Sequence, residues 1–243
     1  MQALARKLTR EEVEAYREHG VVTLQGILDP DWVKHAETVF EAVMNGPCEP
    51  LKDLDVAEFA RQLEAQGVKL VTPIEKPPAS KFRIRTFMWR DYPELEDLSR
   101  RGQMPELAAE LLGAQRINFF GDQLFEKQPG SLHRTGFHQD AGYFHLSGEQ
   151  CCSIWMPFDR VDSENGVMGY VRGSHTWKIH AANPFVSQVP LPGSVDQPLP
   201  DIEGHESDYD IAYLDAEPGD AIVHHVRTVH GSTGNTSTTR GRR

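Results

Sequence analysis

Apolar residues recur every three or four positions through much of the N-terminal third of the chain, which is the spacing of amphipathic helices. Two of these patterns begin with helix-start signals. Thr9 and Glu12 match a capping box, and Asp29 can cap a helix whose first residue is a proline. We therefore predict helices between Thr9 and Gly20, between Asp29 and Gly46 and over about 56–66, with a short strand at 21–24.

After residue 81 the dominant pattern is an alternation of apolar and polar residues, which is typical of half-buried strands. The runs are short, turns rich in glycine and proline separate them, and one helix is predicted over 104–112. Such a series favours a β-sandwich or a jelly roll, which brings together strands that are distant in sequence. The predicted strands span 82–89, 116–127, 136–144, 151–158, 167–171, 211–214, 221–226 and the residues around His230.

One of the predicted strands carries a chemical pattern, in which Gln139 separates His138 from Asp140. Residues two apart in a strand point to the same face, so an imidazole and a carboxylate should project into one space. These are two of the three ligands of the 2-His-1-carboxylate triad, which holds non-haem Fe(II) and leaves positions open for a cosubstrate and O2. His230, much later in the chain, is the candidate third ligand. An isolated His-x-Asp triplet is more often a pair of surface residues.

Two other histidines, His224 and His225, lie in the strand-forming run 221–226 that precedes His230. Alternation along a strand would point at most one of them inward. A histidine without ligand spacing is more often a core or surface residue than a ligand. We therefore predict no metal-binding role for either of them.

The charge balance limits the partners that the protein can have. The 243 residues include 36 acidic and 25 basic ones, which gives a formal net charge of −11. A nucleic-acid partner needs a basic face and an anionic membrane attracts basic segments, so we predict neither partner. No apolar run approaches the roughly 20 residues of a membrane helix, and residues 1–10 lack the apolar segment of a signal peptide. We expect a cytoplasmic protein that is a monomer or a homodimer.

Further short motifs accompany the triplet and cover most of the chain. They are the helix-strand opening at 9–28, Phe137-His138-Gln139-Asp140, the segment 161–166 followed by Gly173-Ser174-His175, Pro218-Gly219-Asp220, and His230-Gly231-Ser232 with Asn235 and Ser237. In their order and separations, these motifs resemble those of the phytanoyl-CoA dioxygenase family. No single motif is specific, but their combination is.

The resemblance implies a single domain over 1–243 that is mainly β with flanking helices. Its core would be a double-stranded β-helix, a jelly roll of the cupin type, over about 81–243, and its helical N-terminal part would occupy about 1–80. Such enzymes bind Fe(II) and 2-oxoglutarate and use O2 to hydroxylate a small molecule, with release of succinate and CO2. The family continues beyond the position of Arg243, so we expect the C-terminal end of the domain to be missing here.

By position, the resemblance makes His138, Asp140 and His230 the iron ligands. Related halogenases carry a small residue in place of the carboxylate, so the presence of Asp140 argues against chlorination.

The distal carboxylate of 2-oxoglutarate needs a guanidinium, because a planar fork matches a carboxylate better than an ammonium does. The family's offset from His230 ends at Gly241, between Arg240 and Arg242. We favour Arg242 as the anchor and keep Arg240 as the alternative. Other candidate contacts of the cosubstrate are Ser232, Thr135, Trp155, Lys127 and Gln123.

The candidate substrate residues follow the ligand triplet or lie in the aromatic strand upstream, and they are Tyr143, Phe144, Phe87, Trp89 and Arg83. Aromatic walls with one arginine suit a compact, partly apolar metabolite with an acidic or polar group better than a polymer. No basic patch is evident for the phosphates of CoA. Ordinary core packing explains the aromatic residues equally well.

Three alternatives use the same ligand residues. The same cofactor chemistry serves desaturation, epimerisation or ring formation, and sequence does not separate these outcomes from hydroxylation. A cupin-like module could bind a metal without turnover. A hydrolase could hold Zn²⁺ with the same triad, although an arginine that anchors 2-oxoglutarate argues against it.

Overall fold

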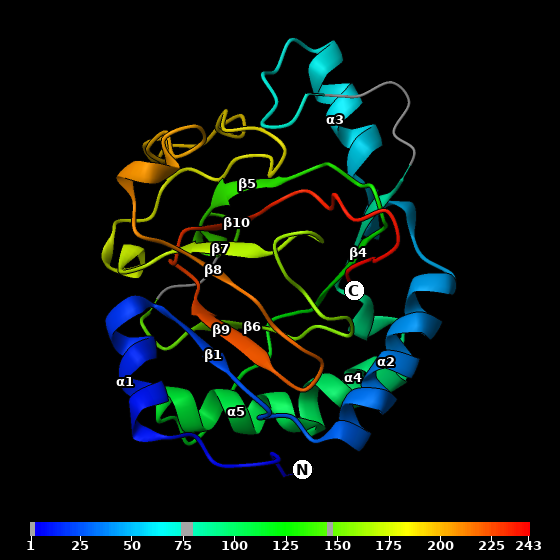
Figure 1. Ribbon diagram of the computed structural model, residues 1–243, viewed down its shortest axis with the longest axis vertical. Coiled ribbons are helices and arrows are strands. Elements are labelled where there is room, and N and C mark those ends of the chain that lie inside the picture. Colours follow the sequence, from blue (N-terminus) through cyan, green and yellow to red (C-terminus); the bar gives the residue numbers. More distant parts are fainter. Residues whose placement is uncertain (1–2, 74–79, 145–147) are drawn as a thin grey trace.

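The computed structural model describes residues 3–73, 80–144 and 148–243, and its strands within these ranges form three antiparallel sheets. Two sheets make up the core, one with strand order β1-β9-β6 and the other with order β5-β10-β7-β8 (Figure 1). Neighbouring strands come from distant parts of the chain, as in the predicted jelly roll, and this fold class is confirmed. The core strands are β1 (Val21–Leu24), β5 (Thr135–His138), β6 (Cys152–Trp155), β7 (Met168–Val171), β8 (Ile211–Leu214), β9 (Ala221–His225) and β10 (His230–Ser232).

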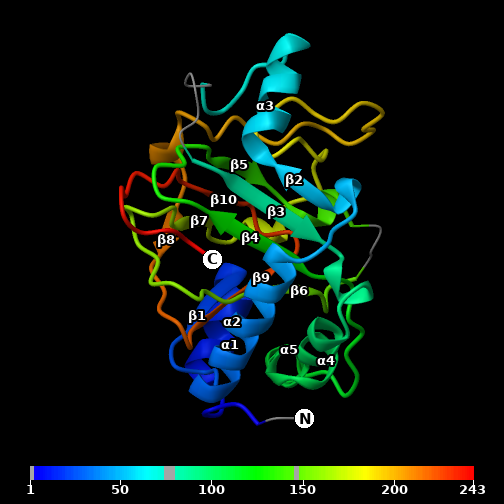
Figure 2. The same ribbon diagram turned by 90° about the vertical axis from the view of Figure 1, so that its right-hand side faces the viewer.

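Four helices lie together beside the β1-β9-β6 sheet, whereas α3 (Val56–Ala65) lies at the opposite end of the molecule (Figures 1 and 2). The largest apolar cluster joins these four helices to the sheet, and it includes Trp32, Phe40, Leu107, Leu24 and Val223. The helices are α1 (Arg10–His19), α2 (Pro30–Asn45), α4 (Pro93–Arg101) and α5 (Gln103–Leu112). The capping box at Thr9 and the cap at Asp29 are both present, as predicted.

The third sheet has the order β2-β3-β4 and packs against α3 (Figure 2). Its strands are β2 (Asp53–Asp55), β3 (Phe82–Thr86) and β4 (Gln123–Lys127). At the end of β4 the backbone of Lys127 pairs with that of Arg242 through two hydrogen bonds of 2.9 Å. The last residues of the chain are therefore held against β4.

Several predicted strands are shorter in the structure. The strand predicted over 82–89 ends at Thr86, because Phe87 adopts a left-handed conformation with φ of 56°. The Asp122 carboxylate then accepts hydrogen bonds from the backbone N–H groups of Met88 and Trp89, at 3.1 and 3.0 Å. The register of β3 with β4 ends at the pair Thr86 and Gln123, so only the Gln123–Lys127 part of the strand predicted over 116–127 forms.

The strand predicted over 136–144 is also cut short, since it ends at His138 and a 3-10 turn follows at Asp140–Gly142. Helix α4 was not predicted. Its pattern is mostly polar, and ion pairs at i, i+4 spacing, such as Glu96 with Arg100, lie along its exposed side.

The N-terminal 80 residues are not purely helical, because β1 pairs with β9 in the core and β2 pairs with β3. Among the described residues, no helix has the length and apolar character needed to cross a membrane.

Candidate metal centre

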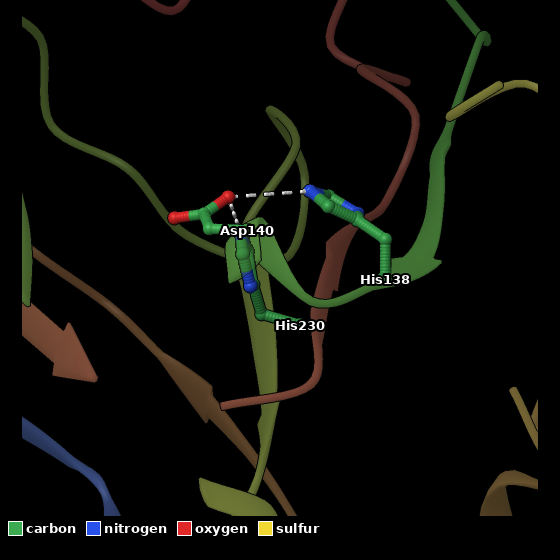
Figure 3. A group of neighbouring side chains, drawn as sticks. All are labelled: His138, Asp140 and His230. Atoms are coloured by element: carbon green, nitrogen blue, oxygen red, sulfur yellow. Dashed lines mark ion pairs between the residues drawn. The ribbon is translucent and has the colours of Figure 1, made fainter. Parts of the chain in front are cut away.

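The three residues of the proposed triad meet where β5 and β10 pair (Figure 3). His230 is the register partner of His138, and Asp140 follows two residues after His138 at the start of the 3-10 turn. One ligand atom from each residue lies within 4.8 Å of the other two. In the part of the chain that the structure describes, no other group of three His, Cys, Asp or Glu residues meets this geometry.

Backbone hydrogen bonds fix the orientation of both imidazoles. His138 Nδ1 lies 2.8 Å from the Gly136 carbonyl oxygen, and His230 Nδ1 lies 3.0 Å from that of Thr228. Both Nδ1 atoms therefore carry the proton and donate it. This leaves each Nε2 atom as a free acceptor facing Asp140 Oδ1, at 3.8 Å in both cases. Metal-binding histidines are usually oriented by this kind of contact.

Burial and mutual contact set the protonation states of the triad. Burial lowers the pKa of His138 and His230 and keeps both rings neutral. Burial alone would raise the pKa of the Asp140 carboxyl, but the adjacent imidazoles of His230 and His224 outweigh it and hold that pKa far below its usual range. Two neutral imidazoles and one carboxylate form the donor set that a divalent transition metal prefers.

The second oxygen of Asp140 has partners that the sequence motif did not reveal. Ser153 Oγ donates to Asp140 Oδ2 at 2.5 Å, and His224 Nε2 lies 3.1 Å from the same oxygen. His224 faces the triad, whereas the ring of His225 contacts the Glu149 carbonyl oxygen instead. Only one of the two adjacent histidines therefore faces the triad, as strand alternation predicted. The sequence did not reveal Ser153, because its place beside His224 depends on the register of β9 against β6.

Two buried basic residues, Lys127 and Arg242, lie beside the triad along β10. Lys127 is fully buried, and its amine donates to the Thr233 carbonyl oxygen at 2.8 Å and to Ser232 Oγ at 3.2 Å. Arg242 is 3% exposed and donates to the Gly166 carbonyl oxygen. Neither side chain pairs with a carboxylate of the described residues, and Arg242 Nε has no hydrogen-bond partner among them.

Burial shifts the titration of both cations. It lowers the pKa of Arg242 to about 10, so the guanidinium stays charged at neutral pH. Burial, with a smaller contribution from the Arg242 charge, lowers the pKa of Lys127 well below its usual value. Unpaired buried cations are costly, and a bound anion would remove much of that cost.

Most of the other candidate cosubstrate residues lie near Lys127 and Arg242. Ser232 Oγ donates to Thr135 Oγ1 at 3.0 Å, and the Arg242 guanidinium lies 5.9 Å from the centre of the Trp155 ring. Gln123 lies at the exposed end of β4, away from Lys127 at its other end, and does not join the group.

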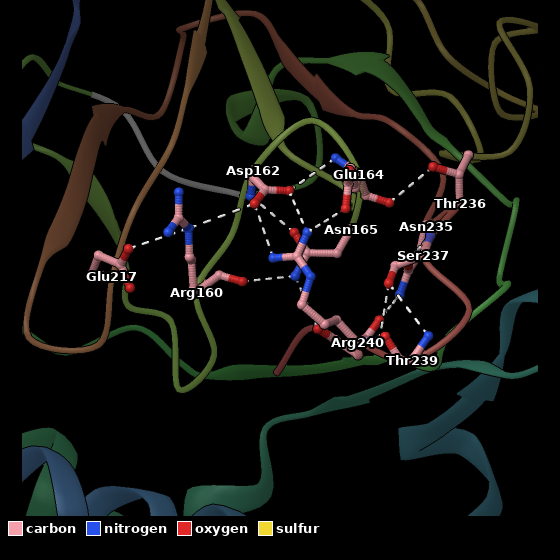
Figure 4. A network of polar contacts seen from close by, with 11 residues as sticks. Arg160, Asp162, Glu164, Asn165, Glu217, Asn235, Thr236, Ser237, Thr239 and Arg240 are labelled. Atoms are coloured by element: carbon pink, nitrogen blue, oxygen red, sulfur yellow. Dashed lines mark hydrogen bonds and ion pairs between the residues drawn. The ribbon is translucent and has the colours of Figure 1, made fainter.

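Arg240 does not join Lys127 and Arg242, because its guanidinium is already paired with carboxylates. Its guanidinium donates to both oxygens of Asp162 at 2.9 Å and to Glu164 at 2.8 Å (Figure 4). Residues of the same loop are tied together by Asn235, whose side chain donates to the Arg240 carbonyl oxygen at 2.8 Å. The two candidate arginines therefore differ in their environment, since Arg240 has carboxylate partners and Arg242 has none among the described residues.

The aromatic candidates gather beside the ligand turn. The Tyr143 ring meets the His138 ring edge-on at 5.7 Å, and its hydroxyl donates to the Asn183 carbonyl oxygen. Phe144 and Phe87 both contact Phe120, at 4.7 and 5.8 Å between ring centres. Trp89 packs on Phe119 at 5.6 Å. Sequence reasoning missed Phe119 and Phe120, although two adjacent aromatic residues within the strand predicted over 116–127 were a visible signal.

Arg83 is not part of this aromatic group. Its guanidinium forms a two-point ion pair with Asp53 and donates to the Met44 carbonyl oxygen at 2.7 Å. It lines a polar surface pocket with residues of β2 and β4, none of which belongs to the triad. Alternation along β3 turns the Arg83 side chain away from the buried Phe82 and Ile84.

The chain matches the model of the family named phytanoyl-CoA dioxygenase (PhyH) over residues 16–243. It is 22% identical over 237 residues to the peroxisomal phytanoyl-CoA dioxygenase of Rattus norvegicus. That alignment covers 93% of this chain but 63% of the rat protein, so the chain spans less than two thirds of this relative's length.

Two solved structures of enzymes from nogalamycin biosynthesis resemble the fold. The non-haem α-ketoglutarate-dependent carbocyclase SnoK from nogalamycin biosynthesis is 23% identical, with a TM-score of 0.68 over 100% of this chain and 83% of that chain. The epimerase SnoN, in complex with Fe³⁺, α-ketoglutarate and nogalamycin RO, is 21% identical, with a TM-score of 0.59 over 96% of this chain and 79% of that chain. At this level of identity, the likeness bears on the fold alone.

Proposed function

The chain belongs to the phytanoyl-CoA dioxygenase family, and we propose that it is an Fe(II)- and 2-oxoglutarate-dependent dioxygenase that hydroxylates a small molecule. One observation carries the proposal. A three-donor metal centre includes His230 of β10, and two residues on, at Ser232, lie the buried Lys127 and, beside it, Arg242, neither of which pairs with a carboxylate of the described residues. Such a pair of sites suits a metal together with a dianion that reaches from the metal to these two side chains.

The donor set fits Fe(II). His138 and His230 would bind it through Nε2 and Asp140 through Oδ1, because these are the atoms that face one another. Three protein ligands leave the other positions of the metal open for a cosubstrate and O2. Both Nδ1 atoms are already held by backbone carbonyls, so the rings need no rearrangement to bind.

The buried side chains of Arg242 and Lys127 suit the distal carboxylate of 2-oxoglutarate. Arg242 has an unpartnered Nε atom, and a guanidinium fork can bind both oxygens of a carboxylate. Lys127 would add a second positive charge, and Ser232 a hydroxyl that already contacts Lys127 and Thr135. We propose Arg242 rather than Arg240 as the anchor, since Arg240 is bound to Asp162 and Glu164. A Zn²⁺ hydrolase binds no 2-oxoglutarate and would not require these two side chains beside the metal.

Iron and 2-oxoglutarate, when bound, supply an oxidising species from O2 and release succinate and CO2. The chain itself supplies position and exclusion of water. Trp155 lies beside Arg242, and the Tyr143 ring meets the His138 ring edge-on. The buried ligands, of which Asp140 is 9% exposed, keep the centre largely away from bulk solvent.

For the substrate, we propose a compact and partly apolar metabolite. The aromatic group beside the ligand turn supports this proposal, with Tyr143, Phe144, Phe87 and Trp89 as candidate walls and Phe120 added to them. Arg83 is left out because Asp53 occupies its guanidinium. The location in the cytoplasm and the monomeric or homodimeric state stay predictions from the sequence.

A metabolite screen tests the function. The purified chain is incubated with Fe(II), ascorbate, O2 and 2-oxoglutarate, and succinate formation is measured with and without each candidate metabolite. We expect a compact metabolite to stimulate succinate formation above the uncoupled rate. A response to fatty acyl-CoA thioesters alone would contradict the proposed substrate class, and no succinate under any condition would favour a metal-binding module without turnover.

The mass of the product separates the oxidative outcomes. Hydroxylation adds one oxygen atom, desaturation or ring formation removes two hydrogen atoms, and epimerisation leaves the mass unchanged. We expect the product to carry one oxygen atom derived from O2, which labelling with ¹⁸O2 would detect.

A further inference from the structure

The two oxygens of the Asp140 carboxylate have different environments. Oδ1 faces Nε2 of both His138 and His230, at 3.8 Å. Oδ2 instead accepts a hydrogen bond from Ser153 Oγ at 2.5 Å and lies 3.1 Å from His224 Nε2. One oxygen is therefore free for a metal, while the other is occupied by the protein.

The two partners of Oδ2 are a cross-strand pair. Ser153 on β6 lies opposite His224 on β9 in the antiparallel register. Side chains of directly opposed residues point to the same face of a sheet, so both reach the carboxylate from the β1-β9-β6 sheet. The triad itself belongs to the β5-β10 pair and the turn after it. The contact thus links the metal centre to the opposite sheet of the core.

Packing holds the His224 ring in place. It is 4% exposed, and its centre lies 5.3 Å from that of the Tyr170 ring and 4.3 Å from that of the His230 ring. A carboxylate oxygen can only accept, so Nε2 carries a proton and donates to Oδ2. Nδ1 has no hydrogen-bond partner among the described residues. The ring therefore makes a single polar contact with protein, and that contact is the carboxylate of a proposed metal ligand.

We propose that His224 and Ser153 are positioning residues that hold Oδ2, so that Asp140 binds the metal through Oδ1 alone. This inference rests on the proposed function, because it assigns a role within the same metal centre. A carboxylate held on one side cannot rotate to chelate the metal with both oxygens. The metal then keeps one more position open than it would with a chelating carboxylate.

His224 acts through Asp140 and is not a fourth ligand. Its nitrogen atoms fall outside the group of mutually close donors that His138, Asp140 and His230 form. Its Nε2 is directed at a protein oxygen and carries the proton of that hydrogen bond. A substitution of His224 that keeps an N–H donor near Oδ2 should therefore keep the function of this residue.

The test compares His224→Phe with His224→Gln. Phenylalanine keeps a ring between Tyr170 and His230 but has no donor, whereas the glutamine amide can place an N–H group near the position of Nε2. Dissociation constants are measured by titrating the metal-free protein with Co²⁺ and following its visible absorption. Loss of a contact behind a metal ligand typically weakens metal binding about 10- to 100-fold, and we expect this loss for His224→Phe.

We expect His224→Gln to bind Co²⁺ within about threefold of the wild type, well inside the loss expected for Phe. We also expect the absorption of Co²⁺ bound to His224→Phe to differ in shape, because a released carboxylate can chelate and change the coordination number. Ser153→Ala should change the spectrum in the same direction, with a smaller loss of affinity. Equal loss of Co²⁺ affinity in His224→Phe and His224→Gln would indicate that His224 is itself a ligand. Unchanged affinity and spectrum in His224→Phe would show that His224 does not position Asp140. Either result overturns the proposal.

A matched control separates positioning from general packing. His225 lies next to His224, is 5% exposed and contacts the Glu149 carbonyl oxygen instead of the triad. His225→Phe should leave the Co²⁺ affinity and spectrum unchanged. Thermal melting of each metal-free variant is recorded, and a Co²⁺ effect that follows the loss of melting temperature in both histidine variants would overturn the positioning role.

The same experiment distinguishes failure of this inference from failure of the proposed function. If the wild type binds no Co²⁺, the metal centre itself is wrong. If the wild type binds Co²⁺ and His138→Ala does not, the centre stands. The His224 comparison then decides the positioning role alone.

Discussion

The two ends of β10 illustrate opposite electrostatic situations within three residues. At His230 the chain gathers two neutral imidazoles and a carboxylate, a set that carries negative charge. At Ser232 it gathers Arg242, which stays charged at neutral pH, and Lys127, whose pKa burial lowers; neither pairs with a carboxylate of the described residues. Either site alone would be expensive to bury. Their proximity suggests that one bound group, a metal with a dicarboxylate, satisfies both.

The comparison also shows how each site is built. The donors of the metal centre are pre-oriented by backbone carbonyls and by Ser153 and His224. The cations are held less completely, since Arg242 retains an unpartnered Nε within the described part of the chain. The donors of the proposed metal centre are therefore already in position, whereas Arg242 keeps a donor available for the proposed anion.

Removal of a metal ligand should have the largest effect. Asp140→Ala, His138→Ala and His230→Ala each delete one of three donors, and we expect succinate formation to fall by more than the roughly 100-fold loss that removal of a contact behind a metal ligand can cause. The strands do not depend on these side chains, so circular dichroism spectra should match the wild type. Full activity in any of the three variants with Fe(II) present would refute the ligand assignment.

Disruption of the anion site at Arg242 should come next. Arg242→Gln removes the fork that we assign to the distal carboxylate, and loss of one partner of a buried ion pair costs about 3 kcal/mol or more. That cost corresponds to an increase of about 100-fold in the KM for 2-oxoglutarate. Metal binding should be retained, because Arg242 does not contact the triad.

Arg240→Gln is the matched control for this experiment. Its guanidinium binds Asp162 and Glu164 on a partly exposed loop, so the KM should change by less than about twofold. If Arg240→Gln raises the KM and Arg242→Gln does not, the anchor has been assigned to the wrong arginine.

The contrast between these arginines marks how far sequence reasoning reached. The His-x-Asp spacing and the later His-Gly-Ser motif were sufficient to single out three residues that the fold brings together. The motif offset ended between Arg240 and Arg242, and the sequence favoured Arg242 but kept Arg240 as the alternative, because no local pattern shows that Asp162 pairs with Arg240. Partners of that kind are contributed by distant segments and leave no local pattern.

The fold shows the same division. The jelly roll, the capped helices α1 and α2 and the strand Ile211–Leu214 were predictable from local patterns. Strand ends were not, because a contact with Asp122 terminates β3 and a turn at Asp140 terminates β5. Helix α4 is different, because it carries local helix signals that were overlooked: a proline at its start, acidic residues in its first turn and basic residues in its last turn. At the two strand ends, by contrast, the alternation pattern alone did not show where pairing stops.

Lys127 provides a smaller test, through pH. Its pKa is lowered by burial in the free protein, and a bound carboxylate would raise it. Affinity for 2-oxoglutarate should therefore be highest at pH values below the free-state pKa, where Lys127 is charged in both states. It should fall as the pH rises through that value, because binding then requires uptake of a proton.

Calorimetric titration of the metal-loaded protein under anaerobic conditions, over a range of pH, measures this dependence. Lys127→Met should weaken binding by about tenfold and remove the pH dependence attributed to this residue, whereas Lys81→Met, at an exposed position, should do neither. A pH dependence that persists unchanged in Lys127→Met would assign it to another group.

The smallest effect is expected at Arg83, which lies outside both sites. Its hydrogen bond to Asp53 lowers the pKa of that carboxyl to about 2, and Arg85 also contacts Asp53 at 2.8 Å. Arg83→Gln should therefore cost less than about 1 kcal/mol of stability at pH 7, the range of partly exposed ion pairs. The depressed pKa means that this stabilisation is present above the unfolded value of about 4 and is lost as the pH falls towards 2.

Urea unfolding of the wild type and of Arg83→Gln should show the difference in stability shrinking over that pH interval, while turnover and the KM for 2-oxoglutarate stay unchanged. Reduced turnover at unchanged stability would instead indicate that Arg83 contributes to substrate binding.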